Sequence, residues 1–372
     1  MRFLLDDEQT AFARSLDALL TAADTPAVVR AWGAGDHAAG RALWSRIAEL
    51  GVFALAVPEA YEGAGARPVE LAVAFVELGR HGVPGPMVET VAAGALLSGP
   101  GFAHLSKRFL PGVASGETVV TVALPGGGPY VLDGDVADVE LSVCREGGGE
   151  LWVVQGGGDR AGLRSRVRRS LDPARRLALP RPGGQVLAAG PQVVAGAADA
   201  LCWARLATAA QALGVGLTLL DRTVAYVKQR SQFGVPVGSF QAVRHRLADA
   251  KIALEFARPL VFGAALTMHP ADVAAAKVAA CEAAYTTART ALQLHGAIGY
   301  TAEYDLSLWL TKARALRSAW GSPGECRGVV LGEGGGGGAH FGADSGADSG
   351  ADSGADSGAD SGADSGAGDG FG

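Results

Sequence analysis

The sequence predicts a mainly α-helical protein that carries a small β domain near its middle. Apolar residues recur at helical spacing over residues 1–112 and again over residues 196–322. Between these regions, over residues 113–195, the pattern changes to short β-branched runs separated by glycines. With 372 residues, 48% of them hydrophobic and 19% charged, the chain is long enough for two or three packed subdomains.

The first region is predicted to be a helical domain because it contains three apolar faces. Each face repeats every three or four residues, as one side of a core-facing helix does. The faces are formed by Phe12, Leu16, Leu19 and Leu20, by Leu43, Trp44, Ile47 and Leu50, and by Leu71, Ala74, Phe75 and Leu78.

The middle region is predicted to be a reduced antiparallel β domain. Its apolar runs are residues 118–124, 130–132, 136–143 and 151–154, and glycine-containing turns separate them. The triplets Gly126–Gly128 and Gly147–Gly149 are interpreted as hairpin turns. A phosphate-binding loop is less favoured, because neither triplet stands between a strand and a helix.

Eight arginines occur between residues 160 and 181. This basic cluster allows two interpretations: a site for phosphate groups, or a solvated face, which the pattern favours. The segment also contains Leu171-Asp172-Pro173-Ala174-Arg175-Arg176, which resembles a structural Asp-x-x-Arg turn of the acyl-CoA dehydrogenase family.

The last folded region, residues 196–322, is predicted to be a four-helix bundle. Alanine- and leucine-rich stretches run over residues 198–230, 239–268, 270–295 and 302–320. The first helix should end near Arg230, because Gly234, Pro236 and Gly238 follow, and Ser239 is expected to cap the next helix. Residues 323–372, which include five glycines and repeats of Gly-Ala-Asp-Ser, are predicted to be a disordered tail.

Composition excludes several classes of protein. A net charge of −6 gives no overall basic face, so nucleic acid is an unexpected partner. Acidic residues interrupt the N-terminus before a signal-like apolar run can form, and the apolar stretch at residues 206–220 contains polar residues, so we expect a cytoplasmic protein that does not bind membranes. The four cysteines are too far apart in sequence to suggest a disulfide framework, and no cysteine or histidine spacing indicates a metal site.

Two motifs give the chain a family resemblance. The first is Arg230-Ser231-Gln232-Phe233-Gly234, followed by Gln241-Ala242-Val243, and the second is Gln293-Leu294-His295-Gly296-Ala297-Ile298-Gly299. In this order and separation they resemble the Arg-x-x-Phe-Gly corner and the Gln-x-x-Gly-Gly-x-Gly turn of the acyl-CoA dehydrogenase family. The loop at residues 57–65 is similar to a glycine-rich loop of the family, and it is either a plain connector or a neighbour of the acyl pocket.

This resemblance implies a cofactor, a substrate and partners. The cofactor is FAD, the substrate is an acyl-CoA of fatty acid metabolism, and the electron acceptor is an electron-transfer flavoprotein. The bundle of such proteins forms a homo- or hetero-oligomer in which the corner reaches the flavin of the neighbouring subunit. The residues implied to bind the cofactor are Arg230, Gln232, Phe233, Gln293, Gly296 and Ala297. Arg205 matches an arginine near the acyl pocket, although an ion pair within the bundle is an equal alternative.

The resemblance also shows what this sequence lacks. The catalytic base of the family is a glutamate, found either after the last bundle helix or just before the matched arginine. Trp320 and Ala204 occupy these two positions here, and neither can accept a proton. About thirty residues of the family's β domain are also missing, and Trp152 is more simply a core residue than a replacement flavin wall. Glu303 and His295 are interpreted as structural and orienting residues.

Three functions therefore remain open. The chain is an FAD-dependent oxidoreductase that removes hydrogens across the α and β carbons of a CoA thioester. Alternatively, it is a non-catalytic partner that completes the flavin site of an active relative, which accounts for both the retained corner and the missing bases. The third possibility is a degenerate protein that binds no cofactor.

Overall fold

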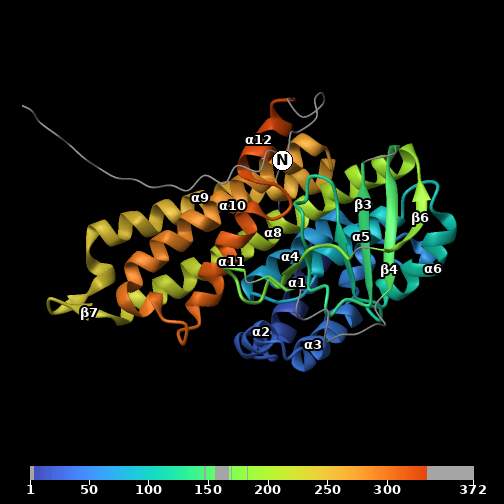
Figure 1. Ribbon diagram of the computed structural model, residues 1–372. Helices are drawn as coiled ribbons and strands as arrows, with labels where there is room; N and C mark the ends of the chain where they lie inside the picture. The colour runs from blue at the N-terminus through green and yellow to red at the C-terminus, as the bar shows by residue number, and fades with distance from the viewer. Residues whose placement is uncertain (1–3, 146–147, 156–166, 169, 182, 333–372) are drawn as a thin grey trace, which may run out of the picture. The chain divides into compact units, whose positions relative to one another are not determined.

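The structure, a computed structural model, describes residues 4–145, 148–155, 167–168, 170–181 and 183–332 (Figure 1). It confirms the mainly helical fold with a small β region. The N-terminal region contains six α-helices, and two short 3-10 helices, η1 (Val52–Ala56) and η2 (Glu59–Tyr61), precede the fourth. The helices are α1 (Asp7–Thr21), α2 (Thr25–Ala34), α3 (Ala38–Glu49), α4 (Pro68–Arg80), α5 (Met87–Leu97) and α6 (Ala103–Ala114).

The β region differs from the prediction in one pairing. A four-stranded sheet has the order β1 (Val120–Ala123), β3 (Val139–Cys144), β4 (Glu150–Gln155) and β6 (Gln185–Ala189). Its β3–β4 and β4–β6 pairs are antiparallel, but β1 and β3 are parallel. The Gly126–Gly128 triplet is therefore not a hairpin turn, because a parallel pair requires a crossover connection. That crossover contains β2 (Val131–Leu132), which pairs with β5 (Leu177–Ala178).

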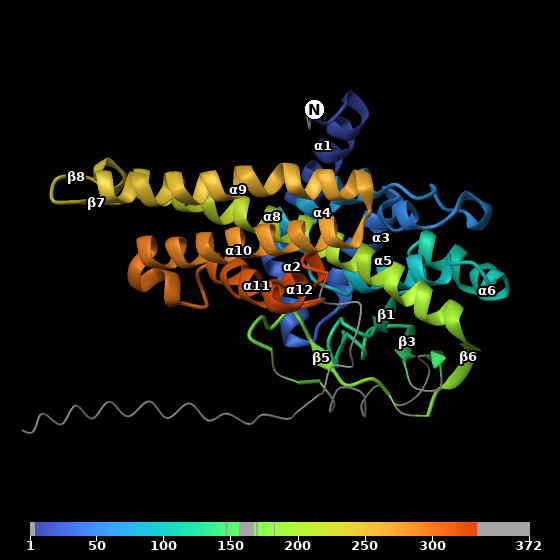
Figure 2. The same cartoon turned by 90° about the horizontal axis from the view of Figure 1, so that it is seen from above.

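The predicted four-helix bundle is present. It consists of α8 (Pro191–Gln229), α9 (Gln241–Thr267), α10 (Pro270–His295) and α11 (Leu306–Ser318). In Figure 2, α8, α9 and α10 run side by side, and the small hairpin of β7 (Ser231–Gln232) and β8 (Val235–Pro236) lies at the end of the bundle away from the sheet. By length and composition α8 could cross a membrane, yet 67% of its apolar window is buried inside the fold, as in the core helix of a bundle.

Two predicted details of the C-terminal region are wrong. Ser239 does not cap α9: Phe240 is the N-cap residue, and the Ser239 hydroxyl instead donates to the Pro236 carbonyl at 2.7 Å. The first part of the predicted disordered tail, residues 323–372, is a helix, α12 (Pro323–Val330). It begins with a capping box between Ser322 and Glu325 and buries Cys326. The repeats lie outside the described residues.

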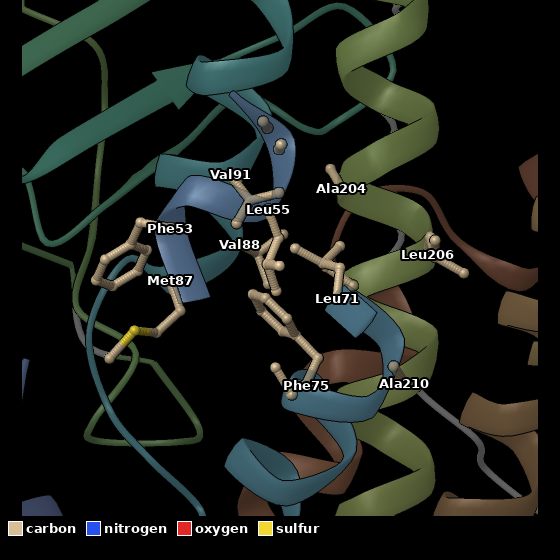
Figure 3. Packing of buried hydrophobic residues seen from close by; sticks show 14 of the residues in the cluster. Phe53, Leu55, Leu71, Phe75, Met87, Val88, Val91, Ala204, Leu206 and Ala210 are labelled. Carbon is tan, nitrogen blue, oxygen red and sulfur yellow. The ribbon is translucent and has the colours of Figure 1, made fainter. Parts of the chain in front are cut away.

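The N-terminal helices and the bundle share one hydrophobic core. Figure 3 shows Leu71 and Phe75 of α4 and Val88 of α5 facing the side of α8 that carries Ala204, and all four residues belong to the same core. Close approach is possible because glycines lie at the contacts: a Cβ at Gly214 would come within 1.9 Å of the Val76 carbonyl oxygen. The shared core fixes α5 against α8, which positions the interior site described below.

Most of the arginine cluster that can be described does not form a solvated face. Arg176 forms buried ion pairs with Asp133 and Asp135, and Arg181 pairs with Glu140 at 2.8 Å. The turn predicted at Asp172 is confirmed, because the Arg175 amide donates to the Asp172 carbonyl at 2.9 Å. Arg160, Arg164, Arg166 and Arg169 lie outside the described residues.

Candidate functional site

The predicted cofactor corner is an exposed turn at the end of the bundle. Helix α8 ends at Gln229, and the chain folds into the β7–β8 hairpin before the 3-10 turn η4 (Val237–Ser239) leads into α9. Phe233 adopts a left-handed backbone conformation with φ 53°, and its side chain is 90% exposed. Arg230 and Gln232 are also exposed. This corner therefore presents an aromatic ring, a guanidinium and an amide to the outside of the chain.

The second motif lies at the same end of the bundle. Arg246, in the second turn of α9, donates a hydrogen bond to the Gln293 side chain near the end of α10. The rings of Tyr226 and His295 stack at 4.2 Å, which joins the last turn of α8 to the last turn of α10. The structure thus brings Arg230, Gln232 and Phe233 to one end of the bundle with Gln293, Gly296 and Ala297.

The His295 ring is held in the interior by its own helix, and the orienting role expected from the sequence stays a prediction. Its ring is buried, and Nδ1 lies 2.8 Å from the Ala291 carbonyl oxygen, an arrangement in which Nδ1 carries the proton and donates. Burial lowers the pKa of His295, so the neutral ring is favoured. The glycine turn that follows, η5 (Gly296–Tyr300), begins with Gly296 at φ 64°.

Trp320, which occupies one of the two positions expected for a catalytic glutamate, lies in a buried turn. Trp320 follows α11, is 4% exposed and has φ 58°. Arg205 donates from Nε to the Trp320 carbonyl at 3.1 Å, and the buried Lys277 donates to the Gly321 carbonyl at 2.7 Å. The indole ring lies so close to Gly127 that a Cβ there would be 2.7 Å away. Interactions within this chain therefore hold the turn in a strained conformation.

The two residues predicted around the acyl pocket are both engaged in the interior. Ala204 is fully buried in the shared core (Figure 3). Arg205 forms no ion pair among the described residues, so that alternative for its role is wrong. Its guanidinium instead holds the Trp320 turn, and a contact with substrate stays a prediction.

Glu89 is an ionisable residue of this interior that the motifs do not reveal. It lies in the first turn of α5, a helix whose residues are all buried, and it is 3% exposed. Burial raises the pKa of the Glu89 carboxyl group, and the nearby Arg175 and Trp320 only partly oppose that rise. A single charged residue in the otherwise apolar stretch Met87–Leu97 is the sequence signal that could have identified it.

A cavity of about 460 Å³ opens beside Glu89 and Trp320. Arg175 and Arg314 supply two guanidinium groups to its lining. The remaining lining residues are mostly apolar or small: Gly127, Gly128, Pro129, Tyr130, Leu132, Ser170, Leu171, Leu177, Ala315, Ser318 and Ala319. The loop at residues 57–65 does not line this cavity, which favours its interpretation as a connector.

The comparisons with known proteins agree with both motifs. Residues 6–117 match the model of the acyl-CoA dehydrogenase N-terminal domain, and residues 194–327 match that of the C-terminal domain. The chain is 35% identical over 305 residues to acyl-CoA dehydrogenase IpdE2 of Mycobacterium tuberculosis, covering 81% of this chain and 89% of that protein. The IpdE2 protein of Mycolicibacterium smegmatis is 31% identical over 86% of this chain and 97% of its own length.

Solved structures give the same result. A chain in the crystal structure of the ChsE4–ChsE5 complex from Mycobacterium tuberculosis superimposes with a TM-score of 0.76 and 26% identity. The similarity covers 90% of this chain and 98% of that one. Residues 118–193, which hold the shortened β region, lie between the two ranges matched by the domain models.

Proposed function

The chain belongs to the acyl-CoA dehydrogenase family of oxidoreductases, and we propose that it acts as a partner subunit that completes the flavin site of a catalytically competent relative. The assembled enzyme would carry out α,β-dehydrogenation of a CoA thioester. The observation that carries this proposal is the exposed corner of Arg230, Gln232 and Phe233, combined with a base position filled by Trp320.

The residues of the corner fit one edge of a flavin nucleotide held mainly by another chain. Arg230 can pair with a phosphate through two parallel hydrogen bonds, and the exposed Phe233 ring can lie against a flat ring system. Gln232 and Gln293 offer amide donors and acceptors at the same end of the bundle. FAD, once bound, would accept the hydride from the β carbon of the thioester.

The interior of this chain fits the same cofactor poorly. Trp320 packs on Gly127, and the crossover after β1 is short. The cavity of about 460 Å³ is of a size that suits one small ligand, whereas a flavin and a thioester would have to bind side by side. One of the similar solved structures is a complex of two proteins, ChsE4 and ChsE5, and this precedent supports a two-chain enzyme.

A self-contained dehydrogenase is the second candidate, and Glu89 is the observation that favours it. This buried carboxyl group lines the cavity and could act as a base at a position unlike either position of the family. Burial, however, raises its pKa and so favours the neutral carboxyl group, which donates a proton rather than accepting one. The partner role therefore accounts better for the whole site.

The test is the visible spectrum of the purified full-length chain, alone and co-expressed with a full-length relative that retains the glutamate base. We expect flavin absorbance only in the mixed complex. Flavin in the chain alone, together with bleaching by an acyl-CoA that Glu89→Gln abolishes, would establish the second candidate instead. Absence of flavin from both preparations, although the two chains co-purify, would refute both.

The role of the corner is tested in the mixed complex with Arg230→Ala. Loss of a charge-assisted phosphate contact should weaken flavin retention by about 10- to 100-fold. Arg46→Ala, an exposed arginine of α3, is the matched control and should leave retention unchanged. Trp320→Glu tests the second candidate, because a new carboxylate at this position should improve flavin bleaching by an acyl-CoA only if the interior of this chain holds the flavin.

A further inference from the structure

The interior cavity contains polar atoms that the chain itself does not satisfy. Glu89 Oε2 is buried and has no hydrogen-bond partner among the described residues. Most buried carboxyl oxygens in folded proteins are hydrogen-bonded, so an unpaired one requires an explanation. Glu89 is also one of the residues that line the cavity, which places its carboxyl group beside any ligand bound there.

Arg175 is the second group without a partner of opposite charge within bonding distance. It is partly buried and lines the cavity, yet it forms no ion pair in the described part of the chain. The adjacent Arg176 contrasts with it, because its guanidinium pairs with Asp135. The nearby Lys312 is already paired with Asp172 at 3.2 Å, so it is not a free cation.

We propose that this cavity binds a small organic carboxylate with an apolar body, held between the Glu89 carboxyl group and the Arg175 guanidinium. This site lies in the interior, apart from the exposed corner, and the proposal does not rest on the flavin role. Nothing in it requires a second chain.

The charge of the ligand follows from the groups around the cavity. Arg175 and Arg314 both lie in its lining and would repel a cationic ligand. A guanidinium instead pairs with a carboxylate through two parallel hydrogen bonds. The neutral form of Glu89 would add an O–H donor to the same carboxylate, which is a strong charge-assisted hydrogen bond.

The body of the ligand follows from the other lining residues. Trp320, Leu132, Leu171 and Leu177 are apolar, and Tyr130 adds an aromatic ring. A volume of about 460 Å³ lies within the range of sites for single small molecules. A single ring system or a medium-length acyl chain would match both the volume and the lining.

The proposal predicts how binding depends on pH. The charged groups that influence Glu89 are Arg175 in the turn before β5, Lys312 on α11 and Asp133 after β2, and the exposed Arg314 also lines the cavity. Because the neutral Glu89 carboxyl group donates to the ligand, affinity should fall as pH rises through the elevated pKa of Glu89. Ionised Glu89 would then repel the carboxylate.

Calorimetric titration of the full-length chain, without flavin, provides the test. The probes are octanoate and 2-naphthoate, with octanol, octylamine and inorganic phosphate as comparisons. We expect the two carboxylates to bind more tightly than octanol, with no binding of octylamine. A failure of both carboxylates to bind at millimolar concentration would overturn the proposal, as would equal binding of phosphate or preferential binding of the amine.

Three variants locate the site. Arg175→Ala should weaken carboxylate binding by about 10- to 100-fold, and Arg175→Lys should weaken it less. Glu89→Gln keeps a neutral donor and should retain binding while abolishing its pH dependence. The control Arg46→Ala should bind like the parent protein. Unchanged binding in Arg175→Ala, or an unchanged pH profile in Glu89→Gln, would show that the ligand binds elsewhere.

Discussion

Two aromatic residues of this chain have the same backbone strain in opposite surroundings. Phe233 follows α8 with φ 53°, and Trp320 follows α11 with φ 58°, a region that side chains larger than glycine rarely occupy. Phe233 is 90% exposed, and its ring approaches that of Phe240 edge-on with 6.3 Å between the ring centroids. Trp320 is 4% exposed and is held by Arg205 and Gly127.

The difference shows where each turn can act. The Trp320 turn is explained by contacts inside the chain, since buried donors satisfy its carbonyls and the ring fills space beside a glycine. The Phe233 turn makes few such contacts. Interactions within the subunit therefore do not offset the energetic cost of its left-handed backbone conformation. We infer that the interior turn governs stability and ligand binding, and that the corner acts in contacts with another molecule.

The largest effect expected in the interior comes from the ion pair beside the cavity. Lys312 and Asp172 are 3% and 2% exposed and lie 3.2 Å apart. Lys312→Met keeps the side-chain volume but leaves Asp172 buried without its partner, which should lower the free energy of unfolding by about 3–5 kcal/mol. Urea titration measures the change. Lys228→Met at the exposed end of α8 is the control and should change stability by less than about 0.5 kcal/mol. Equal losses in the two variants would remove the distinction between interior and corner.

Glu77 lies outside both the Phe233 turn and the Trp320 turn, so the effect of its titration on stability provides a reference for comparing the two turns. Glu77 of α4 is largely buried, and this burial raises its pKa to about 7 from an ordinary 4.5, against the opposing effect of Arg80. The folded state therefore binds a proton more tightly than the unfolded state. Its contribution to stability is present below pH 4.5 and is lost as pH rises through about 7, on the order of 3 kcal/mol.

Glu77→Gln isolates this contribution from other titrating groups. The difference in unfolding free energy between pH 5 and pH 8 should shrink in the variant relative to the parent chain. Flavin retention by the mixed complex should respond equally to pH in both proteins, because Glu77 lies away from the corner. An identical stability profile for the two chains would show that Glu77 titrates normally.

The packing of Trp320 on Gly127 is expected to have a moderate effect. A Cβ at Gly127 would lie 2.7 Å from the indole ring, so Gly127→Ala must displace the ring or the crossover after β1. We expect a loss of about 1–3 kcal/mol in unfolding free energy and a shift in tryptophan emission. In a Trp320→Leu background the cost of Gly127→Ala should be smaller, which a double-mutant cycle would detect. Strict additivity of the two changes would contradict the contact.

The sequence identified the corner better than it identified the interior. The Arg230 motif is local, so its residues, its helix end and its turn could all be predicted from consecutive positions. Glu89 and Trp320 meet only when α5 and the turn after α11 come to the same cavity, and residues 231 positions apart give no such signal in one sequence. The parallel pairing of β1 with β3 was missed because short apolar runs do not encode strand direction. Ser239 failed as a cap because the Pro236 carbonyl accepts its hydroxyl.

The smallest effect on stability, and the sharpest contrast with the interior, is expected at Phe233. Removing an exposed ring with Phe233→Ala should change the unfolding free energy of the isolated chain by less than about 0.5 kcal/mol, because little apolar area returns to water. The same variant should lower flavin retention in the mixed complex, since the ring is proposed to lie against the flavin there. Leu4→Ala, at an apolar residue that is 76% exposed and lies outside the bundle, is the matched control for the flavin measurement. If Phe233→Ala destabilises the isolated chain as much as Gly127→Ala does, the corner is a structural element of the subunit, and its exposure is no argument for a neighbouring molecule.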